Sequence, residues 1–321
     1  MACLQTYVLG VDVAKHWLDC AASDRRKPWR IANTDAAIAE LVAALDARQR
    51  DGQSVLVVVE ASGGQEQRLR AALDEAGIPV HVGNAKRIRD YARALGWMAK
   101  TDRLDATLLR RYGEREQPRP TPATDTARRE LAELIAYREQ LQAEITARSQ
   151  QCRQYRSPAL RQRAERALAE LEAERDALTG MIAEAMQAPA LADAHAILRS
   201  CPGVGVMTAA VLLAYLPELG HLSDKQIASL AGLAPFPCDS GHLKGRRVTS
   251  GGRGKVRNGL YMAASIAAQR NPPIQAMRQR LLERNKPPKV VRVALMRKLL
   301  VTLNAMIREQ TPWNPEDYAT P

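Results

Sequence analysis

The first 115 or so residues alternate between continuously apolar runs and amphipathic segments. Thr6–Val13 (TYVLGVDV) and Ser54–Val59 (SVLVVV) are rich in β-branched residues, which is typical of strands buried on both faces. In Asp35–Arg48 the apolar residues recur at helical spacing, so this segment predicts a helix. Further strands are predicted at Trp17–Ala22, Pro28–Ala32 and Pro79–Val82, and further helices at Gln65–Glu75, Asn84–Leu95 and Asp102–Tyr112.

This order of elements is three strands, helix, strand, helix, strand, helix. It predicts an α/β domain of the ribonuclease-H-like type over residues 1–116. A Rossmann-type domain would need a glycine-rich turn after its first strand. That place is taken by Asp12-Val-Ala-Lys15, which has no glycine to receive a phosphate.

The second half of the chain is predicted to be mainly helical. Residues 117–124 (QPRPTPAT) form a proline-rich break. Residues 125–188 are rich in Ala, Glu, Arg, Leu and Gln, and Ser157-Pro158 divides them, which favours a helical hairpin or coiled-coil linker acting as a dimerisation arm or a rigid spacer. Residues 193–310 predict a compact helical domain, and residues 311–321 a poorly ordered tail.

Charge and residue usage narrow the function. Lys and Arg number 47 against 35 Asp and Glu, a net charge of +12, which is typical of a protein with a polyanionic partner such as nucleic acid. On charge alone, a merely basic soluble protein is an equal alternative. The five Cys and five His are scattered, so neither a zinc site nor a disulfide framework is indicated. The chain shows no signal peptide, and its longest apolar run, Val206–Leu216, is too short to cross a bilayer. We therefore expect a cytoplasmic protein with no membrane partner.

Four carboxylates stand at positions that suit a metal site. Asp12 and Glu60 end two apolar strands, where α/β folds place their sites, and Asp102 and Asp105 lie three apart on one predicted helix. Each pair of converging carboxylates repels by about 4 kcal/mol at 4 Å and an effective dielectric constant of 20. Mg²⁺ or Mn²⁺ removes that cost and can activate a phosphodiester. One such acid alone would be a solvated loop residue or a helix cap, but four in this order predict a metal centre.

The helical domain contains a segment of helix-hairpin-helix form. Pro202-Gly-Val-Gly205 separates two predicted helices, and Gly203 and Gly205 permit a tight turn. The free N–H groups at the start of the following helix suit a DNA phosphate. A plain helical turn is the alternative reading.

A glycine-rich basic segment follows, from residue 232 to residue 258. Its basic side chains are predicted to contact a nucleic-acid backbone; they are Lys244, Arg246, Arg247, Arg253, Lys255 and Arg257. Ser250 lies among them. From the residues alone Ser250 reads as a loop hydrogen-bonding group, although clustered guanidinium groups could activate it as a nucleophile.

These motifs resemble those of a known family. The resemblance runs over about residues 5–310 and is to the DEDD transposases of the IS110 type, which include the Piv-type site-specific DNA invertases. The motifs that carry it are Gly10-Val-Asp12-Val-Ala-Lys15, Glu60-Ala-Ser-Gly63, Lys100-Thr-Asp102-Arg-Leu-Asp105-Ala106, Pro202-Gly-Val-Gly205, Gly232-Leu-Ala-Pro235, Asp239-Ser-Gly241 and Ser250-Gly-Gly-Arg253.

The resemblance implies that residues 1–116 form a Holliday-junction-resolvase-like domain. It also implies a mechanism. Asp12, Glu60, Asp102 and Asp105 match the family's Mg²⁺-binding acidic tetrad, and Ser250 matches its serine nucleophile, which becomes covalently linked to a DNA phosphate. In the family a non-coding RNA encoded by the element pairs with donor and target DNA. The protein acts as a homodimer that assembles into tetramers on DNA. Two other functions stay open: a structure-specific endonuclease that uses the carboxylates and water, and a non-catalytic nucleic-acid-binding protein.

Overall fold

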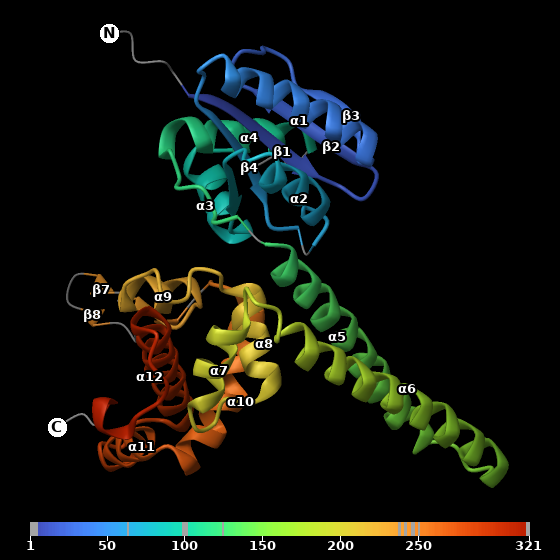
Figure 1. Cartoon of the computed structure of the whole chain (residues 1–321), viewed down its shortest axis with the longest axis vertical. Helices are drawn as coiled ribbons and strands as arrows, with labels where there is room; N and C mark the ends of the chain where they lie inside the picture. The colour runs from blue at the N-terminus through green and yellow to red at the C-terminus, as the bar shows by residue number, and fades with distance from the viewer. Residues whose placement is uncertain are drawn as a thin grey trace. The chain divides into compact units, whose positions relative to one another are not determined.

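The computed structural model describes residues 6–62, 64–97, 102–123, 125–236, 239–240, 243–244, 248–249 and 251–318. For residues 102–104, 236, 239–240, 243–244, 248 and 317–318 this description stops at the backbone. The chain divides into two compact units, residues 1–124 and 125–321, which are described separately below (Figure 1).

The first unit is built on a five-stranded mixed sheet in the order β3-β2-β1-β4-β5. The first three strands are antiparallel neighbours, whereas β4 and β5 join the sheet parallel to β1. The predicted ribonuclease-H-like arrangement is confirmed. The strands are β1 Tyr7–Val13, β2 Trp17–Ala22, β3 Trp29–Ala32, β4 Val55–Glu60 and β5 Val80–Gly83.

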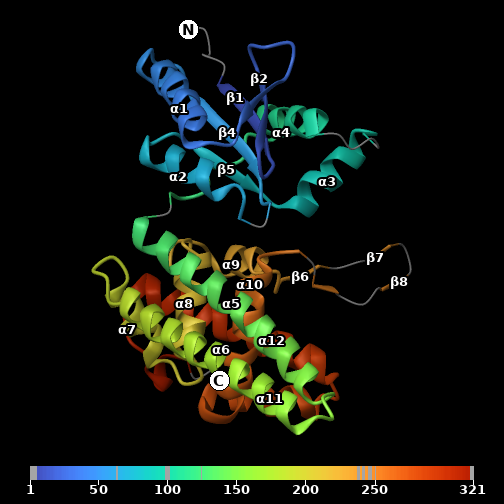
Figure 2. The ribbon, with the colours of Figure 1, turned by 90° about the vertical axis from the view of Figure 1, so that its right-hand side faces the viewer.

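Helices cover both faces of this sheet (Figure 2). On one face α1 (Asp35–Arg50) and α2 (Gln67–Glu75) pack on the odd-numbered apolar residues of β1 and β4. On the other, α3 (Ala85–Ala94) and α4 (Asp102–Glu116) pack on the even-numbered ones. Because β1 and β4 are buried on both sides, their sequences are apolar as far as Asp12 and Glu60 instead of alternating.

The position of α4 over the sheet depends on two glycines. A Cβ on Gly10 would overlap the carbonyl oxygen of Ala106 and the amide nitrogen of Arg110. A Cβ on Gly113 would lie 2.6 Å from a methyl group of Val8. Since Gly113 lies over Val8 and the preceding turns lie over Gly10, α4 runs antiparallel to β1. Its first turn therefore lies toward the carboxyl end of that strand.

The second unit begins with a helical hairpin of α5 (Thr126–Cys152) and α6 (Pro158–Ala185). Pro158 occupies the first turn of α6, where its missing N–H costs nothing. The predicted hairpin is thus present, although the apolar residues of α6 are buried unequally. Leu178 and Ile182 are buried, whereas Leu160 near the hairpin tip is 48% exposed.

The rest of the second unit is a helical bundle with α8 inside it. Seven of the ten residues of α8 are buried, in a core built largely of Ala, Leu and Val. None of the helices, over their described residues, is long and apolar enough to cross a membrane. The helices are α7 Ala192–Ser200, α8 Val206–Tyr215, α9 Asp224–Leu230, α10 Gly254–Arg270, α11 Pro272–Glu283 and α12 Pro288–Glu309.

The C-terminal segment differs from the prediction of a poorly ordered tail beginning at Thr311. The indole of Trp313 packs against the core of the bundle, and its amide donates to Ser200 Oγ at 2.7 Å. A short 3₁₀ turn, Pro315–Tyr318, follows. The sequence pattern missed this anchor because a single aromatic residue between prolines has no periodicity.

Candidate active site

A row of polar residues runs from the edge strand β3 across β2 and β1 to β4 in the sheet of the first unit. Arg30 of β3 is the register partner of Asp19 in β2, and Asp19 is the partner of Asp12 in β1. Val11 and Val59 are register partners in the parallel strands β1 and β4. Asp12 and Glu60 are the next residue of each strand, so they lie side by side near the strand ends. Adjacent strands lie about 4.8 Å apart. The row thus brings two of the predicted carboxylates together.

The row faces α4. Side chains two residues apart on a strand share a face. Gly10 lies two residues before Asp12, and Val58 lies two residues before Glu60. Both Gly10 and Val58 lie on the face of the sheet that α3 and α4 cover. Both carboxylates are half-buried there.

Helix α4 supplies the other two predicted acids. Its direction over β1 brings its first turn toward the level of Asp12. Ala106 is fully buried and Asp105 beside it is half-buried. Asp102 is the first residue of α4, and its side chain lies outside the described part of the chain.

The donor chemistry of these residues fits a hard divalent cation. Carboxylate oxygens from two strand ends and one helix are the ligands that Mg²⁺ and Mn²⁺ prefer. Among the described side chains no group of three converges closely enough to hold a metal ion, and that set lacks Asp102. The fit to a cation therefore rests on donor chemistry alone, and Asp12, Glu60 and Asp105 are the described residues that could contribute ligands beside Asp102.

Asp19 is a fifth acid that sequence reasoning missed. It is 1% exposed and accepts two hydrogen bonds from Arg30, at 3.1 Å from Nε and 2.7 Å from Nη2. A buried carboxylate is costly unless it is paired in this way. Burial, and then the negative charge of Asp19, raise the pKa of the neighbouring Cys20 thiol to about 12. A signal for Asp19 was present, since it is the one charged residue of the strand WLDCAA and lies two positions from the exposed Trp17.

Glu66 is a second missed residue, and it holds the loop that follows Glu60. Its carboxylate is nearly buried and accepts from the backbone N–H and the hydroxyl of Ser62 and from the N–H of Gly64. Three bonds to one carboxylate fix the chain directly after β4. Gly63, part of the Glu60-Ala-Ser-Gly63 motif, lies outside the described residues.

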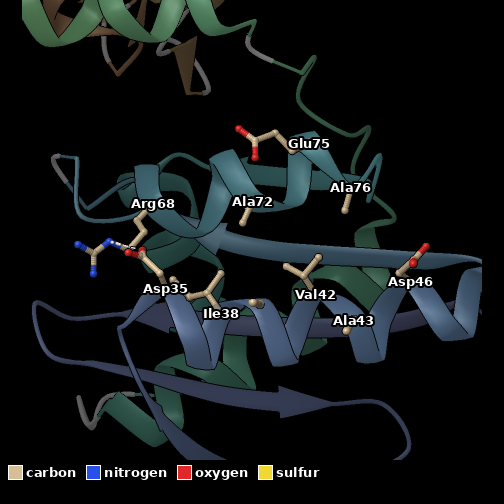
Figure 3. A pocket seen from close by; sticks show the side chains of 10 residues that line it. Asp35, Ile38, Val42, Ala43, Asp46, Arg68, Ala72, Glu75 and Ala76 are labelled. Carbon is tan, nitrogen blue, oxygen red and sulfur yellow. Dashed lines mark ion pairs between the residues drawn. The ribbon is translucent and has the colours of Figure 1, made fainter.

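A groove on the opposite side of the sheet is separate from this row. It lies between α1 and α2, has a volume of about 430 Å³ and includes the ion pair of Asp35 with Arg68 (Figure 3). Alanines form much of its lining, as at Ala72 and Ala76. Among the described residues that line it, none is a predicted site residue.

In the second unit the two hairpin glycines differ in role. Gly203 has a φ of +103°, and a Cβ on it would lie 2.7 Å from Ala267 of α10, so packing alone requires glycine there. Gly205 is exposed, caps the N-terminus of α8 and has open space where a Cβ would be. Of the two, Gly205 is the one whose surroundings leave room for a ligand.

Three glycines form a tight junction directly after Ser250. Gly232, Gly251 and Gly252 all have φ between +71° and +73°, which other residues rarely adopt. The backbones of Gly232 and Gly252 approach so closely that a Cβ on either would overlap its neighbour. Ser250 itself lies outside the described residues, as do Arg246 and Arg247.

The described part of the basic segment contains short strands. Two short strand pairs occur in it, β6 (Pro235–Phe236) with β9 (Val248–Thr249), and β7 (Asp239–Ser240) with β8 (Leu243–Lys244). Two-residue strands have no readable alternation, so the pattern did not reveal them. The side chain of Lys244 is not described.

The three described basic residues of this segment bond to the protein itself. Arg253 pairs with Glu218 through both terminal nitrogens, at 2.5 and 2.6 Å. Arg257 donates to the carbonyl oxygen of Gly251 at 2.6 Å, which ties α10 to the glycine junction.

Lys255 bonds to Glu139 at 2.8 Å and to the hydroxyl of Tyr215 at 3.1 Å. Burial alone would lower the pKa of Lys255, but these two partners outweigh it and the pKa is raised. Lys255 therefore stays charged while it links α10 to α5. Together these contacts of the three basic residues hold the start of α10 in place.

The sheet order and the carboxylates at the carboxyl ends of its central strands define a class of enzymes that transfer phosphodiesters. Two family models place the chain within that class. One, described as a transposase of the DEDD IS110 type, matches residues 9–157, and the other, the transposase IS116/IS110/IS902 family, matches residues 195–279. The chain belongs to the IS110 family of DEDD transposases, a group of phosphodiester-transfer enzymes that act on DNA and typically use a divalent metal.

Relatives match over nearly the whole chain. The pilin gene-inverting proteins of Moraxella lacunata and Moraxella bovis are each 29% identical over 319 residues, covering 97% of this chain and 98% of theirs. A 43.6 kDa protein of insertion element IS110 from Streptomyces coelicolor is 33% identical over 135 residues, which is 39% of this chain and 32% of that one. The chain is thus similar to DNA invertases and to proteins of insertion elements.

Among solved structures, Thermus thermophilus RuvC in complex with a Holliday junction substrate is similar. The match covers 36% of this chain and 99% of that chain at 15% identity, with a TM-score of 0.24. At that score the likeness carries no argument about function.

Proposed function

We propose that this transposase cuts and rejoins DNA through a covalent phosphoserine at Ser250, with divalent metal held at Asp12, Glu60, Asp102 and Asp105 and with sites chosen by a guide RNA. The observation that carries the proposal is the row that aligns Asp12 with Glu60 on the sheet face covered by α4. Carboxylates gathered in this way are unfavourable without a cation.

The carboxylates bind and orient. Asp12 and Glu60 are fixed by the strand register, and Glu66 fixes the loop after Glu60. Asp105 is carried on a helix whose distance from the sheet is limited by Gly10. A bound Mg²⁺ would withdraw charge from the phosphate and stabilise the oxygens that attack and leave.

The serine conserves the energy of the broken bond. Ser250 Oγ attacks phosphorus and loses its proton, a serine–phosphate bond forms, and the bond to the departing strand oxygen breaks and that oxygen gains a proton. A hydroxyl of another strand then reverses these steps on the same phosphate and releases the serine. No nucleotide triphosphate is needed, because one phosphoester is exchanged for another. The glycine junction after Ser250 supports this role, since it fixes the chain from Gly251 onward.

The charge distribution supports nucleic acid as partner. Between residues 241 and 308 the sequence has sixteen Lys and Arg and one acid, Glu283. Such a segment suits both DNA and a guide RNA. The hairpin of α5 and α6 suits a homodimer that assembles to a tetramer on DNA. The names of the Moraxella relatives favour inversion as one reaction of this chain.

The test is a search for DNA attached to protein. The protein is incubated with Mg²⁺, the flanking RNA of its element and labelled donor and target DNA, and the products are run on a denaturing gel. A covalent band is expected that vanishes in Ser250→Ala and when RNA is omitted. Asp12→Asn and Glu60→Gln should abolish cleavage and leave DNA binding largely intact, because binding is spread over many basic residues.

The alternative function gives a different result. Free cleaved ends, with no covalent band and no effect of Ser250→Ala, would identify a metal-dependent endonuclease that uses the carboxylates and water.

A further inference from the structure

An exposed tryptophan lies beside the carboxylate row. Trp17 begins β2 and is 48% exposed, whereas Trp29 and Trp97 are only partly accessible and pack against the two sheet cores. Trp17 lies two residues from Asp19, the register partner of Asp12, so it is the diagonal neighbour of Asp12 on the same face. Diagonal neighbours have Cα atoms about 7–8 Å apart, within reach of an aromatic side chain. A large aromatic surface is therefore open to solvent next to a predicted catalytic carboxylate.

Arg30 accompanies this tryptophan. Its guanidinium carbon lies 6.0 Å from the ring centroid of Trp17. The guanidinium is oriented by the two hydrogen bonds to the buried Asp19, while 38% of the Arg30 side chain stays exposed. Asp19 therefore fixes the orientation of a cation that still has surface available.

The neighbouring turn adds no negative charge. Lys15 and His16, which join β1 to β2, are both exposed. The acid nearest to Arg30, Asp19, is buried and already paired. The exposed groups at this edge are thus an indole, a guanidinium, an ammonium and an imidazole.

This combination suits one chemical class of ligand. An aromatic face can stack on any nucleobase, so this contact does not depend on the DNA sequence. A guanidinium can bind the phosphate next to that base. In a duplex the base faces are already stacked on one another, so the indole can receive only an unpaired base. A nucleotide with its base on Trp17 and its phosphate on Arg30 would lie directly beside Asp12 and Glu60.

We propose that Trp17 and Arg30 form a subsite for one unpaired nucleotide of the DNA strand that enters the carboxylate row, and that Asp19 is the positioning residue of this subsite. The inference rests on the proposed function in one respect: the strand held here is the strand that is cut. The subsite would make the enzyme favour DNA that is opened or distorted near the cleavage point.

The test is equilibrium binding in EDTA, so that no strand is cut. The full chain is titrated into two labelled duplexes of equal length, one fully paired and one with a central run of unpaired thymines. Trp17→Ala is expected to weaken binding to the unpaired DNA by roughly 5- to 150-fold, the loss of one base-stacking contact, and to leave the paired duplex unchanged. Trp17→Phe, which keeps an aromatic face, should retain most of the preference.

Two further variants separate stacking from charge. Arg30→Lys keeps a positive charge for Asp19 but loses the planar fork, so it should weaken binding to the unpaired DNA selectively. Arg25→Gln is the matched control, because Arg25 lies in the turn that joins the same two strands but is placed over Trp29, which packs on the other face of the sheet. It removes one positive charge and should affect both duplexes alike.

Equal effects of Trp17→Ala on both duplexes, or no effect on either, would overturn the subsite. Failure of the proposed function is a separate result. If the wild-type protein cleaves no DNA with Mg²⁺ but prefers unpaired DNA through Trp17, the subsite stands and the catalytic proposal falls. If Trp17→Ala is neutral while Asp12→Asn abolishes cleavage, the reverse holds.

Discussion

Gly10 of β1 and Ala106 of α4 meet through backbone atoms, with no side chain between strand and helix. A Cβ on Gly10 would overlap the carbonyl oxygen of Ala106. This contact sets how closely α4 approaches the sheet. Since Asp105 is the neighbour of Ala106 and Asp12 lies two residues beyond Gly10, the same contact sets the distance between helix and strand carboxylates.

Gly10→Ala is therefore expected to affect both stability and cleavage. The added methyl group would push α4 away from β1, because the atoms that it meets are backbone and cannot move alone. Overpacking of this kind costs about 1–3 kcal/mol. A lowered Tm together with a larger loss of Mg²⁺-dependent cleavage is the expected result.

Gly180 offers the matched control for that variant. It is exposed on α6, and a Cβ there would meet nothing within 4 Å. Gly180→Ala should raise stability by about 0.5–1 kcal/mol through helix propensity. If Gly10→Ala proved as harmless as Gly180→Ala, the close approach of α4 would not matter for the site.

The carboxylate row predicts a metal-dependent gain in stability. A cation that binds the folded chain alone stabilises it by about 2.7 kcal/mol at a concentration one hundred times its Kd. Mn²⁺ should thus raise the Tm of the wild-type protein and not that of Asp12→Asn. In EDTA, Asp12→Asn should be at least as stable as wild type, since one repelling charge is gone.

Asp46→Asn serves as the control for the metal experiment. Asp46 lies on α1, on the other side of the sheet (Figure 3). Its carboxylate pairs with Arg50 of the same helix. Its Mn²⁺ response should equal that of the wild type. An identical Mn²⁺ shift in Asp12→Asn would mean that the ion binds elsewhere.

The order of elements and the place of Asp12 and Glu60 could be predicted because each depends on local pattern. A buried parallel strand is apolar throughout, and an acid that interrupts it at its end is conspicuous, as in VLVVVE. The same reasoning failed for Asp19, since its significance depends on strand pairing with Arg30. Pairing across eleven residues is tertiary information that the local pattern lacks.

The basic segment shows a similar limit. Sequence reasoning assigned Arg253, Lys255 and Arg257 to a nucleic-acid backbone because they alternate with glycines. Their partners within the protein come from α5, from the turn after α8 and from the glycine junction. The pattern could not have foreseen Glu139 or Glu218, which lie on other elements far along the chain.

Breaking the pair of Arg253 and Glu218 should mainly reduce stability. Glu218 is 8% exposed, so Arg253→Gln would leave its carboxylate buried without its cation. The loss of one partner from such a pair costs about 3 kcal/mol. Unfolding in urea should show this loss, and the double variant with Glu218→Gln should recover part of it, because the two residues are coupled.

DNA affinity separates the two roles of Arg253. Where both proteins are folded, Arg253→Gln should bind DNA within a few-fold of the wild type. If Arg253→Gln left stability unchanged but strongly weakened DNA binding, the main role of Arg253 would be to contact nucleic acid.

His81 on β5 should make the stability of the first unit depend on pH. Burial lowers the pKa of His81, and the charge of Arg87 adds to this, although a hydrogen bond to the carbonyl oxygen of Arg119 opposes it. The neutral ring donates that bond from Nδ1 at 2.8 Å. At pH values above the ordinary histidine pKa of about 6.5, His81 is neutral in both the folded and the unfolded chain. In that range its contribution to the stability of the folded state is fully present.

As the pH falls below 6.5, the unfolded chain takes up a proton that the folded chain does not yet accept. Stability then decreases, with a slope of at most about 1.4 kcal/mol per pH unit, until the folded-state pKa is passed. Urea unfolding of the wild type and of His81→Gln between pH 7.5 and 5.5 measures the effect. The stability advantage of the wild type over His81→Gln should shrink on acidification; an advantage that stays constant or grows would show that His81 takes up its proton equally well in the folded chain.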